Sequence, residues 1–64
     1  MMKPRKGDLF KRKKSYRYEQ NEIMVVLKIT DLNAHFLYRI DYFSTFYNTF
    51  CGTVYFSYDE IELL

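Results

Sequence analysis

The sequence predicts an all-β protein, a small antiparallel barrel of about five strands with one short helical turn near the C-terminus. Hydrophobic residues recur at every second position over 23–29 and 34–42, which is the two-residue period of a β-strand. Aromatic residues make up 20% of the 64 residues, and aromatic side chains favour strands. A chain of this length has room for a single domain.

The two alternating segments predict a central hairpin. In the strand 23–30 both faces are apolar at the start, with odd-numbered residues on one face and even-numbered residues on the other. Asp31-Leu32-Asn33 is expected to link the strands, with Asn33 in the left-handed conformation. The return strand is expected to be wet on one side only. Its apolar side holds Ala34, Phe36, Tyr38, Ile40 and Tyr42.

The start of the chain is strongly basic. Residues 1–7 contain the only proline and no apolar periodicity, so we expect a flexible basic leader, followed by one small β-barrel domain over 8–64. Leu9 and Phe10 form a short apolar step into the first strand. Lys11–Lys14 are predicted as a charged turn, with Ser15–Tyr18 completing a bent hairpin with a basic tip.

A further strand and a closing turn complete the predicted fold. The segment 43–48 is expected to be a loop, and Thr49–Phe56 a strand in which Gly52 allows a bend or bulge. Ser57 and Glu60 have the spacing of a capping box, which predicts a helical turn. The last residues then form either one or two turns of helix or a short strand over 61–64, and the strand is favoured because its pairing with the first strand would protect both edges. The residues expected to point inward from the strand 49–56 are Phe50, Gly52, Val54 and Phe56, with Cys51, Thr53 and Tyr55 outward.

This layout resembles the small SH3-like barrels, including Tudor-type and KOW-type modules. The resemblance covers residues 6–64. It rests on Lys6-Gly7-Asp8-Leu9-Phe10 entering a strand, on three longer antiparallel strands, and on a polar turn before a terminal Ile61-Glu62-Leu63-Leu64. It implies an SH3-like antiparallel barrel, a fold that is used for binding nucleic acids or proteins.

The charge distribution points to a polyanionic partner. The first 17 residues hold eight Lys and Arg against one acid, a net +7, while the other 47 hold two against seven acids, a net −5, which together give the net charge of +2. Clustered cations displace counterions from phosphates, and neighbouring tyrosine rings can stack on unpaired bases. The residues predicted to contact DNA or RNA are Lys11, Arg12, Lys13, Lys14, Tyr16, Arg17 and Tyr18.

Aromatic residues near the predicted loop offer an alternative site. Phe43, Phe46 and Tyr47, with Phe50 nearby, could form an exposed patch that binds a host protein. The same rings could instead close one end of a barrel, or form a self-complementary patch in a homodimer. The protein-binding alternative describes a phage-type or plasmid-type accessory protein or inhibitor, a source that fits the abundance of residue types with AT-rich codons.

The composition excludes several classes of function. Cys51 is the only cysteine and His35 the only histidine, so neither an internal disulfide nor a zinc site is expected. Both residues are expected on outward faces. They could form a nucleophilic pair only if the fold brought them within hydrogen-bond reach, with an orienting acid such as Asp41. We therefore expect no enzyme activity, no catalytic residues, no metal and no cofactor. No apolar run approaches the roughly 18 residues that span a bilayer, so the expected location is the cytoplasm, with no membrane partner.

Overall fold

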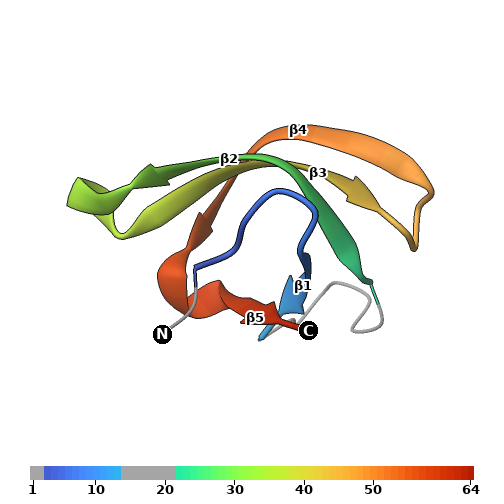
Figure 1. Ribbon diagram of the computed structural model, residues 1–64, viewed down its shortest axis with the longest axis horizontal. Coiled ribbons are helices and arrows are strands. Elements are labelled where there is room, and N and C mark those ends of the chain that lie inside the picture. The colour runs from blue at the N-terminus through green and yellow to red at the C-terminus, as the bar shows by residue number, and fades with distance from the viewer. Residues whose placement is uncertain (1–2, 14–21) are drawn as a thin grey trace.

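A computed structural model describes residues 3–13 and 22–64 of the protein. Five antiparallel strands form one sheet in the order β4-β3-β2-β1-β5 (Figure 1), which confirms the predicted all-β class. Two 3₁₀ turns, η1 and η2, are the only helical elements in these residues. The elements along the chain are β1 (Leu9–Arg12), β2 (Met24–Leu32), η1 (Asn33–His35), β3 (Leu37–Ser44), β4 (Thr49–Ser57), η2 (Tyr58–Glu60) and β5 (Ile61–Leu63).

The sheet curls around its own core. Figure 1 shows β2, β3 and β4 as an arch, with β1 and β5 beneath its concave side. The strand order begins with β4 and ends with β5, and these two strands do not pair, so the sheet is not closed. This arrangement is compatible with a small barrel-like fold.

The core lies on the concave side and is rich in aromatic rings. Phe10 and Phe56 are fully buried, and their ring centroids lie 5.5 Å apart in an edge-to-face arrangement. Such pairs add to the stabilisation that comes from burial alone. The predicted apolar side of β3 is confirmed over Tyr38, Ile40 and Tyr42. The full buried set is Phe10, Met24, Val26, Tyr38, Ile40, Tyr42, Phe56 and Ile61.

Two register shifts change which side chains face this core. In β2 the pairing with β3 shifts between Val26 and Lys28, so the buried Val26 is followed on the inner side by Ile29. In β4 the pairing shifts opposite Ile40 and Tyr42, which confirms the bulge expected at Gly52. An extra residue in one strand reverses the facing of every residue beyond it.

The bulge in β4 makes part of the predicted orientation wrong. Val54 and Phe56 face inward as expected, but Cys51 packs against the core and Phe50 is 74% exposed. Cys51 pairs with the buried Tyr42, whereas Phe50 pairs with Phe43 on the outer side. The expectations that Phe50 points inward and Cys51 outward are therefore both wrong beyond the bulge.

The β2–β3 connection also differs from the prediction. Strand β2 continues through Asp31 and Leu32, and the left-handed residue is Phe36, with φ of 55°, instead of Asn33. Phe36 lies in the connection, 68% exposed, and Ala34 in η1 is exposed as well, so neither belongs to the buried side of β3. At the other end, β3 extends through Ser44, so the predicted loop 43–48 is shortened to a turn over 45–48.

The C-terminal prediction is confirmed. Ser57 and Glu60 form a capping box, in which the main-chain N–H and the hydroxyl of Ser57 both donate to Glu60 Oε1, at 2.7 and 2.9 Å. The short strand β5 follows η2 and pairs antiparallel with β1. Because a capping box depends only on residues three apart, it can be recognised in the sequence.

The described N-terminal residues run beside the sheet. Pro4 is buried, and the N–H of Gly7 donates to the carbonyl oxygen of Val26 at 2.8 Å. Lys11 and Arg12 belong to β1, so the predicted turn over Lys11–Lys14 is wrong for these two residues. The predicted hairpin half 15–18 lies outside the described residues, and the domain boundary at residue 8 stays a prediction. None of the described helical segments is long and apolar enough to cross a bilayer.

Candidate functional site

Three of the seven predicted nucleic-acid contacts are described, and each has a different environment. Lys11 lies opposite Glu62, with Lys11 Nζ 4.0 Å from Glu62 Oε2. Arg12 lies on the inner side of β1, where its guanidinium carbon is 4.8 Å from the centre of the Phe56 ring. Lys13 follows β1 and lines a pocket. The other four, Lys14, Tyr16, Arg17 and Tyr18, lie outside the described residues.

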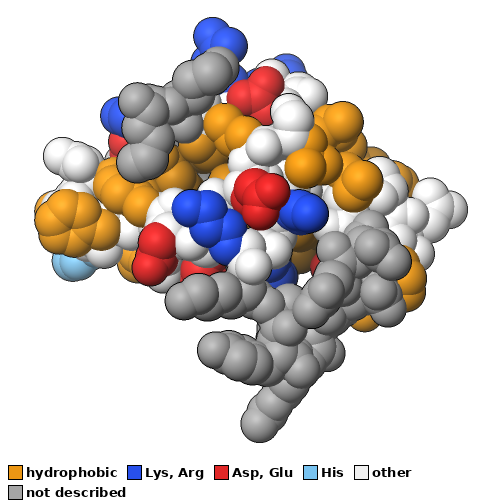
Figure 2. Space-filling model, turned by 90° about the horizontal axis from the view of Figure 1, so that it is seen from below, with side chains coloured by type: hydrophobic (Ala, Val, Ile, Leu, Met, Phe, Trp, Pro, Cys, Tyr) orange, Lys and Arg blue, Asp and Glu red, His pale blue; other side chains and the backbone are white. Residues whose placement is uncertain are grey.

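The described charges alternate in sign on the side of the molecule that carries β1 and β5. In Figure 2, which views this side, Lys and Arg side chains lie directly beside Asp and Glu side chains, with hydrophobic side chains around them. Among the described residues, Lys3 forms a 2.9 Å ion pair with Asp31. Acids from residues 18–64 thus lie close to bases from the first 17 residues, which the linear charge distribution does not indicate.

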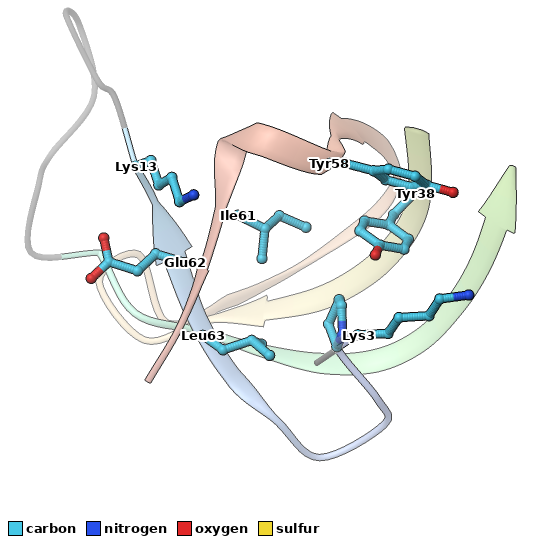
Figure 3. A pocket seen from close by; sticks show the side chains of 8 residues that line it. Lys3, Lys13, Tyr38, Tyr58, Ile61, Glu62 and Leu63 are labelled. Atoms are coloured by element: carbon cyan, nitrogen blue, oxygen red, sulfur yellow. The ribbon is translucent and has the colours of Figure 1, made fainter. Parts of the chain in front are cut away.

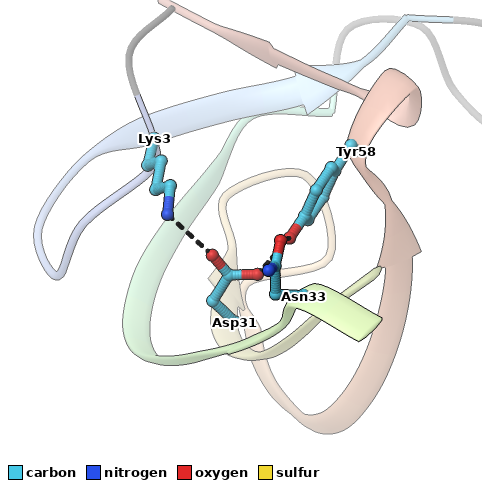
Figure 4. A network of polar contacts seen from close by, with 4 residues as sticks. All are labelled: Lys3, Asp31, Asn33 and Tyr58. Atoms are coloured by element: carbon cyan, nitrogen blue, oxygen red, sulfur yellow. Dashed lines mark hydrogen bonds and ion pairs between the residues drawn. The ribbon is translucent and has the colours of Figure 1, made fainter. Parts of the chain in front are cut away.

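A network around Asp31 joins three distant parts of the chain (Figure 4). Asp31 Oδ2 accepts from Lys3 Nζ, and its Oδ1 accepts a short hydrogen bond from the hydroxyl of Tyr58. Asn33 Oδ1 lies 3.2 Å from the same hydroxyl. The hydrogen bonds from Tyr58 and Lys3 lower the pKa of Asp31, while the bond to Asp31 and burial together raise the pKa of Tyr58 to about 12. The network fixes the tyrosine ring against the end of β2.

Next to this network is a half-open pocket of about 500 Å³ (Figure 3). Its apolar lining comes from the N-terminal segment and from β5, and two tyrosine rings stand at one side. The ring centroids of Tyr38 and Tyr58 are 4.6 Å apart. Lysines reach the pocket from both the N-terminal segment and the end of β1. The lining residues are Lys3, Pro4, Lys13, Tyr38, Tyr58, Ile61, Glu62 and Leu63.

The outer side of the sheet carries a second candidate site, a row of four apolar residues. Leu9 of β1 pairs with Val25 of β2, Val25 pairs with Phe43 of β3, and Phe43 pairs with Phe50 of β4. Their neighbours Phe10, Met24 and Tyr42 are buried on the inner side, so the four paired residues share the outer side. Leu9 is 44% exposed and Phe50 is 74% exposed. We call Leu9, Val25, Phe43 and Phe50 the outer row.

The turn over 45–48, which we call the aromatic turn, exposes two rings and is held in place by hydrogen bonds to buried residues and to the main chain. Phe46 is 49% exposed and Tyr47 is 58% exposed, and their ring centroids lie 4.8 Å apart. The N–H of Tyr47 donates to the hydroxyl of Ser44, which donates in turn to Glu22 Oε2 at 2.6 Å. The N–H and hydroxyl of Thr45 both donate to the carbonyl oxygen of Ile23. Phe43 near the end of β3 and Phe46 and Tyr47 in the following turn thus form two separate ring pairs, Phe43 with Phe50 and Phe46 with Tyr47.

Sequence reasoning missed Leu9 and Val25 of the outer row. Each was identified as a strand residue, but the strands come from distant parts of the chain and only their register aligns them. Tyr58 was also missed, since it was treated only as part of the capping segment. The sequence did offer one indication for Tyr58: it directly follows Ser57 of the capping box, so it belongs to a turn of defined geometry.

The structure does not bring the only histidine and the only cysteine of the chain together. His35 lies in η1, at the β2–β3 end of the sheet, while Cys51 lies in β4 beside Tyr42, toward the opposite end. Burial and a hydrogen bond with Cys51 raise the pKa of Tyr42 to about 12. Within residues 3–13 and 22–64, no group of three His, Cys, Asp or Glu side chains is placed to hold a metal ion.

Comparisons with protein-family models, with curated proteins and with solved structures found no match for this chain. The evidence for each candidate site is therefore the geometry of its own residues.

Proposed function

We propose that this protein is a non-catalytic binding module that recognises a partner protein through the outer row and the adjacent aromatic turn. The single observation that carries the proposal is the register that aligns Leu9, Val25, Phe43 and Phe50 across four neighbouring strands. Exposed hydrophobic residues that occur singly need no explanation, whereas a continuous apolar patch marks an interaction site.

The composition of this surface supports the same proposal. Interface cores are enriched in aromatic residues and depleted in charged ones, and aromatic anchors contribute much of the binding energy. Phe46, Tyr47 and Phe50 each expose about half or more of their surface. The rings of Phe43 and Phe50 pack edge to face at 5.4 Å, so the patch is ordered before a partner arrives. A preformed patch loses less side-chain entropy on binding.

Three finer assignments belong to the proposal. An SH3-like barrel is supported by the strand order β4-β3-β2-β1-β5 and by the 3₁₀ turn before β5. A phage-type or plasmid-type accessory protein or inhibitor of a host protein is supported by size and composition. Action in the cytoplasm is supported by the single cysteine.

The experiment is affinity capture with a matched pair of variants. Phe50→Ser removes the most exposed ring of the outer row, and Tyr55→Ser removes a ring, 54% exposed, from the same strand on the other side of the bulge. We expect the wild type and Tyr55→Ser to retain one partner after nuclease treatment and high salt, and Phe50→Ser to lose it. The partner, identified by mass spectrometry, is then purified and titrated with all three proteins. Equal affinity of Phe50→Ser and the wild type would contradict the proposal.

Nucleic-acid binding is a second candidate, favoured by the charge asymmetry. The described residues 3–13 carry six cations against Asp8 alone, and Lys14 and Arg17 follow in the sequence. Counterion release predicts that binding to short DNA or RNA weakens by orders of magnitude between about 50 and 200 mM salt. Fluorescence anisotropy of the wild type and of a Lys13→Ala/Lys14→Ala double variant tests it, and retaining Arg12 avoids disturbing its contact with Phe56. Unchanged affinity in the double variant would exclude these two lysines as phosphate contacts.

A further inference from the structure

We propose that the pocket beside Tyr58 binds a planar aromatic ring that carries an anionic group, with a nucleoside monophosphate as the matching size class. This goes beyond partner recognition by the outer row, because the pocket and the row share no residue. The inference rests on the size of the pocket, the nature of its walls and the position of Lys13.

The size and walls fit a small-molecule site. A volume of about 500 Å³ lies within the range of roughly 300–1,000 Å³ found for ligand pockets. Ile61 and Leu63 come from β5, and Pro4 comes from the N-terminal segment. These side chains are fixed by contacts elsewhere, since Ile61 belongs to the core and Leu63 packs against it. The apolar part of the pocket is therefore formed in the unliganded protein.

The tyrosine rings give this pocket its preference for an aromatic group. Tyr38 and Tyr58 are inclined by 38° to each other, with Tyr58 the more exposed of the two. The bond from the Tyr58 hydroxyl to Asp31 prevents free rotation of this side chain. A ring in a fixed orientation offers a stacking surface at low entropic cost, and bases of any sequence can stack on an aromatic side chain.

The anionic preference comes from the two lysines. Lys13 projects into the pocket in Figure 3, and among the described carboxylates none lies within 4.0 Å of its Nζ. Lys3 stands on the opposite side, 70% exposed, with its Nζ held by Asp31. Among the described lining residues, Glu62 carries the one carboxylate, which can accept a hydrogen bond from an amino or hydroxyl group of the ligand. A phosphate beside Lys13 would gain a charge-assisted hydrogen bond.

The test uses the full chain and three probes: adenosine monophosphate, adenosine and inorganic phosphate. We expect adenosine monophosphate to shift the amide resonances of Tyr58, Ile61 and Leu63 in ¹H–¹⁵N NMR spectra, with adenosine about tenfold weaker or more, because it lacks the charge. Inorganic phosphate alone is expected to bind more weakly still, because it lacks the ring. Equal affinity for adenosine and adenosine monophosphate would overturn the anionic part of the proposal. An absence of shifts at these three residues would overturn the site.

A charge-matched pair of variants separates the pocket from the general field of the protein. Lys13→Glu reverses the charge at the pocket, and Lys28→Glu makes the same change on the exposed outer side of β2. We expect Lys13→Glu to weaken adenosine monophosphate about tenfold or more and Lys28→Glu to change it less than about threefold. Equal losses in both variants would show a nonspecific charge effect and overturn the role of Lys13. Phe50→Ser should leave this binding intact, so failure of the pocket and failure of the outer row can be told apart.

Discussion

The hydroxyl of Ser44 donates a 2.6 Å hydrogen bond to Glu22 Oε2, and both side chains are buried at the end of β3. The same hydroxyl accepts from the N–H of Tyr47, so one serine ties the start of β2 to the aromatic turn. Burial of polar side chains costs free energy unless they are hydrogen-bonded, and a satisfied buried pair makes its surroundings more rigid. Here it organises the turn that displays Phe46 and Tyr47.

Removing the hydroxyl should destabilise the protein. Ser44→Ala withdraws a donor from a buried carboxylate, so we expect the free energy of unfolding to fall by about 1–3 kcal/mol. Urea denaturation followed by circular dichroism measures the loss. Thr49→Ala, in the exposed residue that pairs with Ser44, is the control and should cost about 0.5 kcal/mol or less. If Ser44→Ala lowered the free energy of unfolding by no more than Thr49→Ala does, the hydrogen bond to Glu22 would make no net contribution to stability.

Truncation of a buried phenylalanine, Phe10, and of an exposed one, Phe50, should have very different effects on stability. Phe10 is fully buried between Tyr42 and Phe56, so Phe10→Ala should cost about 3–5 kcal/mol, enough to unfold much of a domain this small. Phe50→Ala should cost about 1 kcal/mol or less, because Phe50 is 74% exposed. Thermal unfolding of both variants distinguishes them. Similar melting temperatures would contradict the assignment of Phe10 to the core.

Thr53 offers a stabilising substitution. It is β-branched and has φ of 55°, a conformation that disfavours branched side chains and that Asn tolerates. Thr53→Asn should therefore raise the free energy of unfolding by about 0.5–1 kcal/mol, while the bond from its N–H to Asp41 Oδ1 remains. Thr49→Asn, at an exposed strand position without a positive φ, should bring no gain. Chemical denaturation measures the free energy of unfolding of both variants. A loss of stability in Thr53→Asn would show that the backbone at Thr53 is not strained.

The Asp31 network predicts a defined pH window for stability. The pKa of Asp31 is lowered from its ordinary 3.8, so its contribution is complete above that value and is lost as the pH falls further. The pKa of Tyr58 is raised from 10.0 to about 12, so its contribution is complete below 10 and is lost as the pH rises toward 12. The difference in unfolding midpoint between wild type and Asp31→Asn should therefore be largest between about pH 4 and 10. A difference that stays constant from pH 2 to 7 would exclude ionised Asp31 as its source.

Local patterns in the sequence were sufficient where the structure depends on neighbouring residues. The capping box of Ser57 and Glu60 spans four residues, and the alternation over 38–42 matches the pleat of a single strand. The bulge at Gly52 could also be expected, because glycine in a strand often marks one. The all-β class followed from these features, since each was visible without knowledge of its partner strand.

Pairing between distant strands decided the rest. The bulge at Gly52 and Thr53 in β4 reversed side-chain facing beyond it, and so exposed Phe50 and turned Cys51 inward. The bulge one residue beyond Val26 in β2 brought Ile29 to the inner side. The sequence by itself determined the all-β class, the closing turn and the strongly basic character of the first 17 residues. Only the tertiary structure decided which residues form the outer row and the pocket, because both depend on the register between strands that are far apart in the chain, and a shift of one residue moves every side chain to the opposite face.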